Sequence, residues 1–385
     1  MKICIVTEGY PTPNNPGMFV FVDQLVSAWA DLGEEVSVIY PIPLGVEYFD
    51  KNRFYKDKWE KRTAKGNIIT IYSPRYFRAS YKKIGFIDTR KISYHSFQQV
   101  VAREIKQLPQ KPDLLYSHFL PAGCQVGDIS YQMNLPGFCA FGESSLWSIK
   151  GWDQERTRNS LAKLAGIISV STENKRILID NNFYRENDIG IFPNGVDHSL
   201  FYPRNKKEIR KKYNLPEDAF IGAYTGAFSD DKGILRAQEA ALKAGNVQMI
   251  YIGGGANKPE GSNILFCGKL QHDYIPEYLS AADFFILPTK AEGCCNAIVE
   301  AMACGLPIIS ANGAYNDDIL SNEYSIRTDP TDVHAMTEAI KILQSNPDLI
   351  RKMSQAAQEA SKRFDIDVRA SAIIDFMQQK MKRRN

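Results

Sequence analysis

The sequence predicts an α/β protein made of two doubly wound domains, each with a parallel sheet covered by helices. Three observations predict this fold. Short runs rich in β-branched and aromatic residues alternate with amphipathic helical patterns along the chain, as βαβ units do. The 385 residues suffice for two domains with substantial cores. A strong turn signal, Pro193-Asn-Gly195, interrupts the alternation near the middle.

The individual elements follow from these runs and patterns. In the first half we expect strands at 2–6, 35–40, 68–72, 114–117, 138–141, 166–170 and 189–192, with helices including 21–32, 93–108 and 172–181. In the second half we expect strands at 221–224, 248–252, 264–267, 284–287 and 307–310, with helices including 235–244, 275–282, 296–304 and 333–343. The apolar face over 366–381 predicts a last helix. The main division is expected between residues 193 and 194.

Composition excludes several classes of protein. Hydrophobic residues make up 44% of the chain and charged residues 24%, as in ordinary soluble proteins. No apolar run approaches the roughly 18 residues that span a bilayer. Only residues 3–6 of the opening segment form an apolar run, which indicates a first strand rather than a signal peptide. Seven scattered cysteines without a Cys-x-x-Cys favour reduced thiols in a cytosolic protein. Five dispersed histidines give no zinc-ligand spacing, so no metal site is expected.

Residues 51–91 form a basic segment. They include thirteen basic and three acidic residues, a net charge of +10, and aromatic residues are interleaved with the charges. Such a surface suits anionic lipid headgroups or polyanionic glycans, and we expect it to face an anionic membrane or a lipid-linked acceptor. No nucleic-acid motif accompanies it, so nucleic acid is not expected as a partner. A solvated basic face beside an aromatic core remains the alternative.

The most informative stretch runs from Ala291 to Ser310. It holds two carboxylates, Glu292 and Glu300, with seven residues between them. A buried strand is expected before it at 284–288, and a helix after it that begins at Asn296 and stops at Gly305. Glu292 then lies in the turn and Glu300 on the second turn of the helix. A surface helix that happens to carry two glutamates is the alternative interpretation.

The start of this helix is a natural anion site. The amides of Cys294, Cys295 and Asn296 open it, and unpaired N–H groups and the helix dipole both favour negative charge. A phosphate there, beside a carboxylate that can bind two sugar hydroxyls, indicates a nucleotide-sugar. The same field is expected to lower the pKa of these thiols, so that at least one alkylates quickly until nucleotide covers both. Small residues that are buried and inert beside the phosphate are the alternative.

The whole stretch resembles the Glu-x7-Glu signature of retaining glycosyltransferases of the GT4 family, whose GT-B fold has two facing Rossmann-like domains. The resemblance implies an N-terminal acceptor-binding domain at 1–193 and a C-terminal donor-binding domain at 194–365, with the helix of 366–385 returning to the first. It also implies roles for the site. Glu300 would hold the ribose hydroxyls, Glu292 the donor sugar, and the amides of Cys294, Cys295 and Asn296 the diphosphate.

Further strand-end loops resemble the family in part. Gly17 matches a glycine that lets backbone amides approach the donor phosphates or the acceptor. In the loop 224–233, Gly226 and Lys232 match, and Lys232 would neutralise the leaving diphosphate. Ala227 stands where the family usually has an arginine, so one cation must act for two or another must substitute. Leu270 lies in the loop 266–272, which resembles the nucleobase loop. The glycines of 252–255 end another strand.

In the N-terminal half the resemblance is weaker. The family's donor-contacting histidine is replaced by Phe141, and Glu143 is the candidate polar replacement, with a helix-capping carboxylate as the alternative. His118 matches a histidine frequent in the family, with a structural role as the alternative. The implied catalytic set is therefore Glu292, Lys232, His118 and Glu143.

The resemblance implies transfer of a sugar, with retention, from a nucleoside-diphosphate sugar to a hydroxyl of a glycan or lipid-linked acceptor in bacterial surface polysaccharide or glycolipid synthesis. A UDP-sugar is expected rather than a GDP-sugar, no further cofactor or metal is implied, and the leaving phosphate would itself take the acceptor proton. The expected location is the cytoplasm, peripheral at the inner face of the membrane. A GT-B sugar-nucleotide epimerase and a catalytically inactive carbohydrate-binding homologue, suggested by Ala227 and Phe141, remain open.

Overall fold

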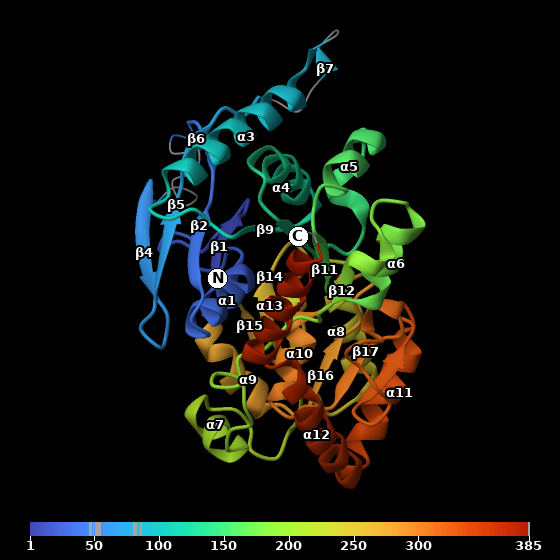
Figure 1. Cartoon of the computed structure of the whole chain (residues 1–385). Helices are drawn as coiled ribbons and strands as arrows, with labels where there is room; N and C mark the ends of the chain where they lie inside the picture. The colour runs from blue at the N-terminus through green and yellow to red at the C-terminus, as the bar shows by residue number, and fades with distance from the viewer. Residues whose placement is uncertain (46–47, 49, 51–54, 80–82, 85–86, 384–385) are drawn as a thin grey trace. The chain divides into compact units, whose positions relative to one another are not determined.

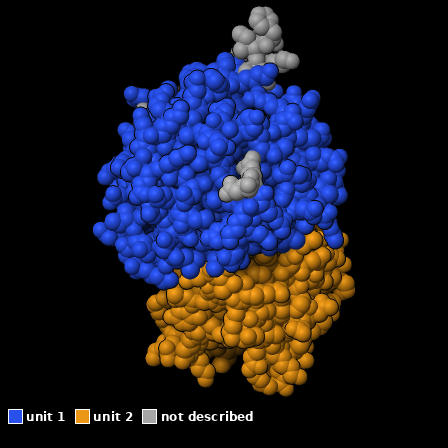
Figure 2. All heavy atoms as spheres, in the orientation of Figure 1, with its two compact units in different colours: residues 1–170, 174–192, 370–385 blue, residues 171–173, 193–369 orange. Residues whose placement is uncertain are grey.

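The structure is a computed structural model that describes residues 1–45, 48, 50, 55–79, 83–84 and 87–383. The chain divides into two compact units, coloured separately in Figure 2. Unit 1 comprises residues 1–170, 174–192 and 370–385, and unit 2 comprises residues 171–173 and 193–369. Both ends of the sequence therefore contribute to unit 1.

Unit 1 is organised around an eight-stranded sheet in the described part of the chain, in the order β12-β11-β10-β9-β1-β2-β5-β4. These strands are, in that order, Ile189–Ile191, Gly166–Ser169, Gly137–Phe141, Leu114–His118, Lys2–Val6, Glu35–Ile39, Ile68–Tyr72 and Lys58–Arg62. Neighbouring strands run parallel except β4, which is antiparallel to β5. The two short pairs are β3 (Ile42–Pro43) with β6 (Arg75–Tyr76), and β7 (Lys83–Ile84) with β8 (Ile87–Asp88). The strand order reverses direction at β9 and β1, which places the loops after these strands at a topological switch point.

The helices of unit 1 complete the doubly wound arrangement (Figure 1). They are α1 (Val20–Asp31), α3 (Thr89–Gln107), α4 (Leu120–Met133), α5 (Gln154–Leu161) and most of α6 (Thr172–Asp180), with the short turns η1 (Leu146–Ile149) and η2 (Glu186–Asp188). The last helix, α13 (Ile366–Lys382), belongs to unit 1 from Ala370 onward. The Trp29 indole of α1 donates to the Ala370 carbonyl at 3.1 Å. The expected return of the C-terminal helix is confirmed.

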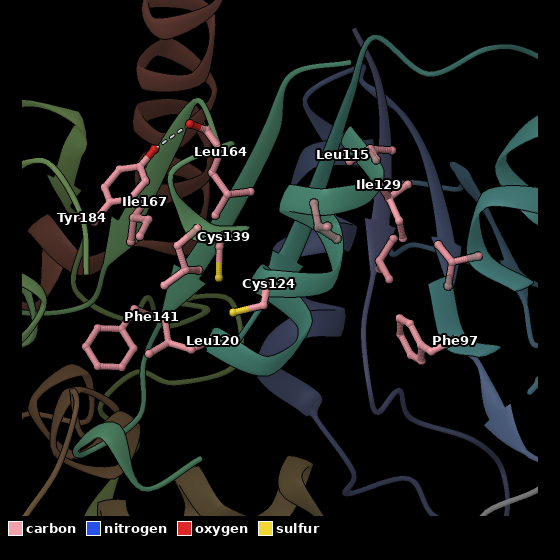
Figure 3. Packing of buried hydrophobic residues seen from close by; sticks show 14 of the residues in the cluster. Phe97, Leu115, Leu120, Cys124, Ile129, Cys139, Phe141, Leu164, Ile167 and Tyr184 are labelled. Atoms are coloured by element: carbon pink, nitrogen blue, oxygen red, sulfur yellow. Dashed lines mark hydrogen bonds between the residues drawn. The ribbon is translucent and has the colours of Figure 1, made fainter. Parts of the chain in front are cut away.

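The core of unit 1 packs α3 and α4 against the middle of the sheet. Figure 3 shows side chains from both helices and from β9, β10 and β11, with Cys124 and Cys139 among them. Helix α4 approaches its neighbours closely because two of its residues are glycines. A Cβ on Gly127 would lie 2.1 Å from the Ser160 carbonyl oxygen, and one on Gly123 would lie 2.5 Å from the Cys139 sulfur.

Unit 2 contains a six-stranded sheet in the described residues, in the order β15-β14-β13-β16-β17-β18 and parallel throughout. These strands are Ile264–Gly268, Val247–Gly254, Phe220–Ala227, Phe284–Leu287, Ile308–Ala311 and Ser325–Thr328. The helices are α7 (Lys206–Lys212), α8 (Ile234–Ala244), α9 (Ile275–Ala281), α10 (Asn296–Ala303), α11 (Val333–Gln344) and α12 (Pro347–Ser361), with short turns η3 (His272–Tyr274), η4 (Ala314–Asn316) and η5 (Lys362–Phe364). The strand order reverses at β13 and β16, so ligands are expected outside the carboxyl ends of these two strands. In the described chain, no helix combines the length and the apolar character that a membrane crossing needs.

Candidate active site

In unit 2, the loops that follow β13 and β16 pack directly against each other. The turn after β13 contains Gly233, whose φ of 73° lies in the left-handed region. A Cβ there would lie 2.4 Å from the Pro288 carbonyl oxygen, so only glycine lets the two loops approach this closely. The Lys290 amide also donates to the Asp231 carbonyl at 2.8 Å. The loops after β13 and β16 therefore form one continuous surface at the switch point of this sheet.

The joined loops bring Lys232 and Glu292 together as an ion pair. Lys232 follows β13, Glu292 follows β16, and their side chains are 29% and 13% exposed. The pair holds a cation and a carboxylate at the same strand ends, where the sequence predicted a phosphate contact and a sugar contact.

Helix α10 begins at Asn296 in this same turn. Cys295 is its N-cap residue and makes no side-chain capping hydrogen bond, so its first turn keeps amides for an anion. Cys294 is anchored from behind by Asn194, whose amide group donates to the Cys294 carbonyl at 3.0 Å and whose backbone N–H donates to its sulfur at 3.3 Å. The turn is thus fixed in position at the start of α10.

The prediction of reactive thiols in this turn was wrong. Cys294 and Cys295 are only 8% and 6% exposed. Burial disfavours the thiolate and raises the pKa of Cys294 to about 12, and it raises the pKa of Cys295 well above its ordinary value. Desolvation outweighs the field of the helix, so the alternative of buried, inert cysteines holds. The two side chains therefore serve as small packing groups, and their amides remain the candidates for an anion.

The second carboxylate of the motif, Glu300, lies on α10 against a histidine. His272 Nε2 and Glu300 Oε1 are 3.3 Å apart, and the Glu300 side chain is 13% exposed. Burial favours the neutral imidazole, but the hydrogen bond and the charge of Glu300 override it and raise the pKa of His272 above its ordinary value. From the sequence, His272 was recognised only as the last residue of the loop 266–272, which resembles the nucleobase loop. Its pairing is a long-range contact that no local motif reveals.

A second lysine lies near the position where the family's arginine is missing. Ala227 pairs in register with Gly254 of β14. A Cβ on Gly254 would lie 2.8 Å from Lys269 Cε, so the stem of Lys269 runs over this strand end. Leu270, the predicted nucleobase contact, follows it in the chain and is partly buried. The loop after β15 therefore carries a cation to the ends of β13 and β14.

Two buried polar atoms at these strand ends lack a hydrogen-bond partner among the described residues. They are Thr225 Oγ1 on β13 and Asn296 Oδ1 at the start of α10. Buried polar groups in folded proteins are usually paired, so such atoms need a partner that the chain does not supply. Gly226, the glycine predicted to approach the donor, is the neighbour of Thr225 and is partly buried.

Sequence reasoning missed Tyr315. Its hydroxyl donates to the Thr289 carbonyl at 2.6 Å, next to the turn that carries Glu292. Burial, and then the negative charge of Glu292, raise the pKa of Tyr315 to about 12. Tyr315 follows the end of β17, so the rule that ligands meet strand ends could have drawn attention to its loop.

The other predicted residues belong to unit 1. His118 ends β9, is 6% exposed and packs edge-on against Phe21, with ring centroids 5.5 Å apart. Phe119 follows with φ 69° and ψ 150°, a region that side chains rarely adopt and that is frequent at functional sites. Gly17 is exposed in the loop after β1, and a Cβ there would meet nothing within 4 Å.

Glu143 lies just after β10 and is 4% exposed. Its Oε1 accepts hydrogen bonds from the Leu120 amide and the Ser148 hydroxyl, both at 2.9 Å. It therefore caps a helix, but the helix is α4 rather than a helix that begins at Ser144. Burial raises the pKa of Glu143 to about 7, although these hydrogen bonds oppose the rise.

Part of the basic segment is described. Lys51, Arg53 and Lys82 lie outside the described residues. Lys61 forms an ion pair with Asp23 of α1, so its charge is used inside unit 1. On and beside the β4–β5 hairpin, four cations are exposed: Lys56, Lys58, Arg62 and Lys65. The described residues contain no group of three or more His, Cys, Asp or Glu side chains that could hold a metal ion.

Comparison with known proteins identifies the family. Residues 16–200 match Glycosyltransferase Family 4, and residues 205–360 match Glycosyl transferases group 1. Together the two matches span most of the chain. The chain belongs to glycosyltransferase family 4. The predicted family is therefore confirmed, and the protein is a glycosyltransferase.

Individual relatives of this glycosyltransferase agree with the assignment. The chain is 26% identical over 357 residues to TuaC, a glycosyltransferase assigned to teichuronic acid biosynthesis in Bacillus subtilis, with 88% of each chain covered. It is 30% identical over 176 residues to an Escherichia coli UDP-Gal:α-D-GlcNAc-diphosphoundecaprenol α-1,3-galactosyltransferase, covering 41% of this chain and 45% of that one. Among solved structures, Anabaena HepE in complex with UDP superposes with a TM-score of 0.74 at 16% identity, over 98% and 100% of the two chains. That likeness confirms the predicted GT-B fold.

Proposed function

We propose that this chain is a retaining glycosyltransferase that moves a sugar from a UDP-sugar to a hydroxyl of a glycan or lipid-linked acceptor. One observation carries the proposal. Glu292 and Glu300, both largely buried, flank the start of α10, and each contacts a basic side chain, Lys232 or His272. This arrangement offers an anion site between two hydrogen-bond acceptors for sugar hydroxyls, which is what a nucleoside-diphosphate sugar requires.

The binding roles follow from this geometry. The amides of Cys294, Cys295 and Asn296 hold the diphosphate, and Glu300 accepts hydrogen bonds from the ribose hydroxyls. Leu270 and the backbone of its loop hold the base. Gly226 leaves room for the donor at the end of β13, and the unpaired Thr225 hydroxyl next to it supplies a hydrogen bond. His272 orients Glu300 through the 3.3 Å contact described above.

The chemistry is mainly stabilisation of the leaving group. Departure of UDP builds negative charge on the diphosphate, and preformed positive groups lower the barrier most where that charge develops. Lys232 supplies one cation, and Lys269 supplies the second in place of the arginine that Ala227 replaces. The leaving phosphate then takes the acceptor proton on the same face of the sugar, which retains the anomeric configuration. Because two lysines and the helix amides supply the positive field, no role falls to a metal ion.

Glu292 contacts the donor sugar rather than the nucleotide. Its ion pair with Lys232 fixes the carboxylate beside the phosphates, where the sugar is attached. The acceptor side is assigned to unit 1, where His118 ends β9 and where Gly17 and Glu143 lie in the loops after β1 and β10. His118 and Glu143 are the other two residues of the proposed catalytic set, and they shape the acceptor side.

The choice of donor and acceptor class rests on the relatives. HepE was solved with UDP, and the galactosyltransferase relative carries both UDP-Gal and a diphosphoundecaprenol acceptor in its name. TuaC and further relatives are named for surface polysaccharides, namely teichuronic acid, capsule and O-antigen. We therefore place this enzyme in bacterial surface polysaccharide or glycolipid synthesis.

The proposed location is the cytoplasmic face of the membrane. All seven cysteines are free thiols, as expected in a reducing compartment. The four exposed cations on and beside the β4–β5 hairpin outnumber the exposed Asp57 and Glu60 there, and they give a surface that anionic lipids attract, at about 1 kcal/mol for each cation near the membrane. Attachment would be reversible and would weaken with salt.

A nucleotide panel tests the proposal. Thermal unfolding is measured with UDP-, GDP- and ADP-sugars, because a ligand that binds the folded state raises the midpoint by mass action. The expected result is a rise with UDP-sugars that exceeds the rise with the other two. The same panel is run on the Glu292→Gln/Glu300→Gln variant, which should lose the response. No response of the parent chain to any nucleotide would contradict the proposed function, and turnover of the donor without any acceptor would instead indicate an epimerase.

A further inference from the structure

Unit 1 contains a cleft that the donor site does not use. Its volume is about 940 Å³, in the upper part of the range of roughly 300–1,000 Å³ that is typical of ligand sites. The cleft opens between the first half of α3, the first turn of α4, and residues 147–160, which include η1 and the start of α5. All of its lining residues belong to unit 1.

The charge of this cleft is strongly positive. Two acidic residues, Glu8 and Asp153, line it, and Asp153 is engaged as the N-cap of α5, where it accepts from the Arg156 amide at 3.0 Å. Five basic residues line it: Arg78, Arg90, Lys91, Lys150 and Arg156. A concave site lined by one sign of charge focuses its field on an oppositely charged ligand. Arg78, Arg90 and Lys91 belong to the basic segment of residues 51–91, so part of that segment lines this cleft and not the β4–β5 hairpin.

Aromatic rings stand among these cations. Trp147 is 65% exposed at the rim, which is unusual for so large an apolar side chain. Deeper in the cleft, Trp152 packs edge-on against Tyr94, and the Arg156 guanidinium lies 4.4 Å from the centre of the Tyr94 ring. An exposed ring offers a flat apolar face on which the apolar face of a sugar can pack, and its neighbours offer charge.

The cleft also holds a polar atom in need of a donor. Gln125 lines it and is 8% exposed, and its Oε1 has no hydrogen-bond partner in the described part of the chain. The Gln125 oxygen needs a hydroxyl or amide donor, and the hydroxyls of a saccharide supply one.

We propose that this cleft binds an anionic saccharide, whose carboxylates or phosphates meet the basic rim and whose hydroxyls reach Gln125. The proposal rests on the proposed function, because the bound saccharide is the acceptor of the transferred sugar. It narrows the acceptor from any glycan to one that carries negative charge. The cleft combines cations, aromatic faces and one buried acceptor, Gln125 Oε1, and an anionic sugar chain carries a matching group for each: acidic groups, apolar ring faces and hydroxyls.

The test is equilibrium binding to the full chain, followed by tryptophan fluorescence and calorimetry. The probes are tetragalacturonate, neutral maltotetraose, inorganic pyrophosphate, and vesicles of phosphatidylglycerol. Tetragalacturonate should bind at low salt and shift the fluorescence, and its affinity should fall as salt rises. Maltotetraose should bind at least tenfold more weakly. In a Trp147→Phe variant, the fluorescence change should shrink.

Matched variants locate the site. Lys91→Ala/Lys150→Ala should weaken tetragalacturonate binding about tenfold, the scale of two partly screened charge contacts. Lys106→Ala/Lys111→Ala removes the same charge from exposed positions of unit 1 outside the cleft and should leave binding within twofold. Gln125→Leu keeps the size of the side chain but removes its oxygen, and should weaken binding several-fold while circular dichroism stays unchanged.

Several outcomes would overturn the proposal. These are equal binding of tetragalacturonate and maltotetraose, equal effects of the two lysine pairs, and binding of vesicles or pyrophosphate but not of the saccharide. UDP binding is measured on the same samples and reports unit 2 independently. If UDP binds and tetragalacturonate does not, the anionic acceptor is refuted while the donor assignment stands. If tetragalacturonate binds and no nucleotide does, the proposed function fails and the cleft remains a saccharide site.

Discussion

Replacing Glu300 by glutamine tests the ribose assignment, because glutamine keeps the shape of the side chain and removes its charge. Glu300 is 13% exposed, so its hydrogen bonds are only weakly screened. Loss of a charge-assisted hydrogen bond costs about 1.5–3 kcal/mol. That range corresponds to a fall in UDP affinity of roughly 10- to 150-fold. The fold should remain intact, because glutamine matches glutamate in shape and in helix propensity.

The same substitution has a second readout in His272. Glu300 raises the pKa of this imidazole against the opposing effect of burial. A histidine whose pKa is raised by folding adds stability that is fully present below its unfolded pKa and is lost as pH rises through its folded pKa. Glu300→Gln should therefore destabilise the protein more at pH 5.5 than at pH 8.5. Urea unfolding at the two pH values measures the difference, and NMR titration should show a lower His272 pKa.

Calorimetric titration with UDP at fixed salt is the decisive assay for this prediction. The control is Glu277→Gln on α9, a glutamate that is paired with Lys212 at 2.5 Å outside the proposed site. The control should bind UDP within twofold of the parent chain. If Glu300→Gln also binds UDP within twofold of the parent, Glu300 does not hold the ribose and the reasoning from the motif is refuted.

The remaining predictions concern the rest of the proposed machinery. Glu292→Ala should lower turnover more than UDP affinity in steady-state and binding assays; equal losses would remove Glu292 from the sugar site. Lys269→Ala should lower turnover at least tenfold, the scale of one lost charge contact to the leaving group, whereas Lys243→Ala, which removes an exposed lysine of α8, should not. Cys294 and Cys295 should react with iodoacetamide far more slowly in the folded chain than in urea at pH 8, because burial keeps both thiols protonated; fast labelling of the folded chain would contradict their burial. Anionic liposomes should carry the protein on flotation at low salt and neutral liposomes should not.

Much of the fold was predictable because parallel sheets buried on both faces leave a local signal. The run 284–287 is continuously apolar, and the structure has a strand there. Strand β4 was not predicted, since its sequence, Lys58-Trp-Glu-Lys-Arg62, alternates exposed and partly buried positions at a sheet edge. Helix α4 was also missed. Its glycines lower helix propensity, and the contacts that require them, such as that of Gly127 with Ser160, are distant in sequence.

The candidate site, like the fold, was predictable from the sequence only where its signal is local. The strand–turn–helix that carries Glu292 and Glu300 was readable, because its pattern is local. The partners were not, since Lys232 reaches Glu292 and His272 reaches Glu300 only when separate strand ends meet in the folded unit. The prediction of reactive thiols at Cys294 and Cys295 failed for the same reason. A helix start can be predicted from sequence, but the burial of one side chain there depends on packing from the whole unit.

We propose transfer of a sugar from a UDP-sugar with retention of configuration, and NMR of the anomeric proton of the product distinguishes retention from inversion. The product is formed from a labelled α-linked UDP-sugar and an acceptor panel that includes uronate oligosaccharides. The expected result is an α-linked product, formed equally well with EDTA present and not formed by the Glu292→Ala variant. A β-linked product, or no turnover of any UDP-sugar by a chain that binds UDP, would contradict the account.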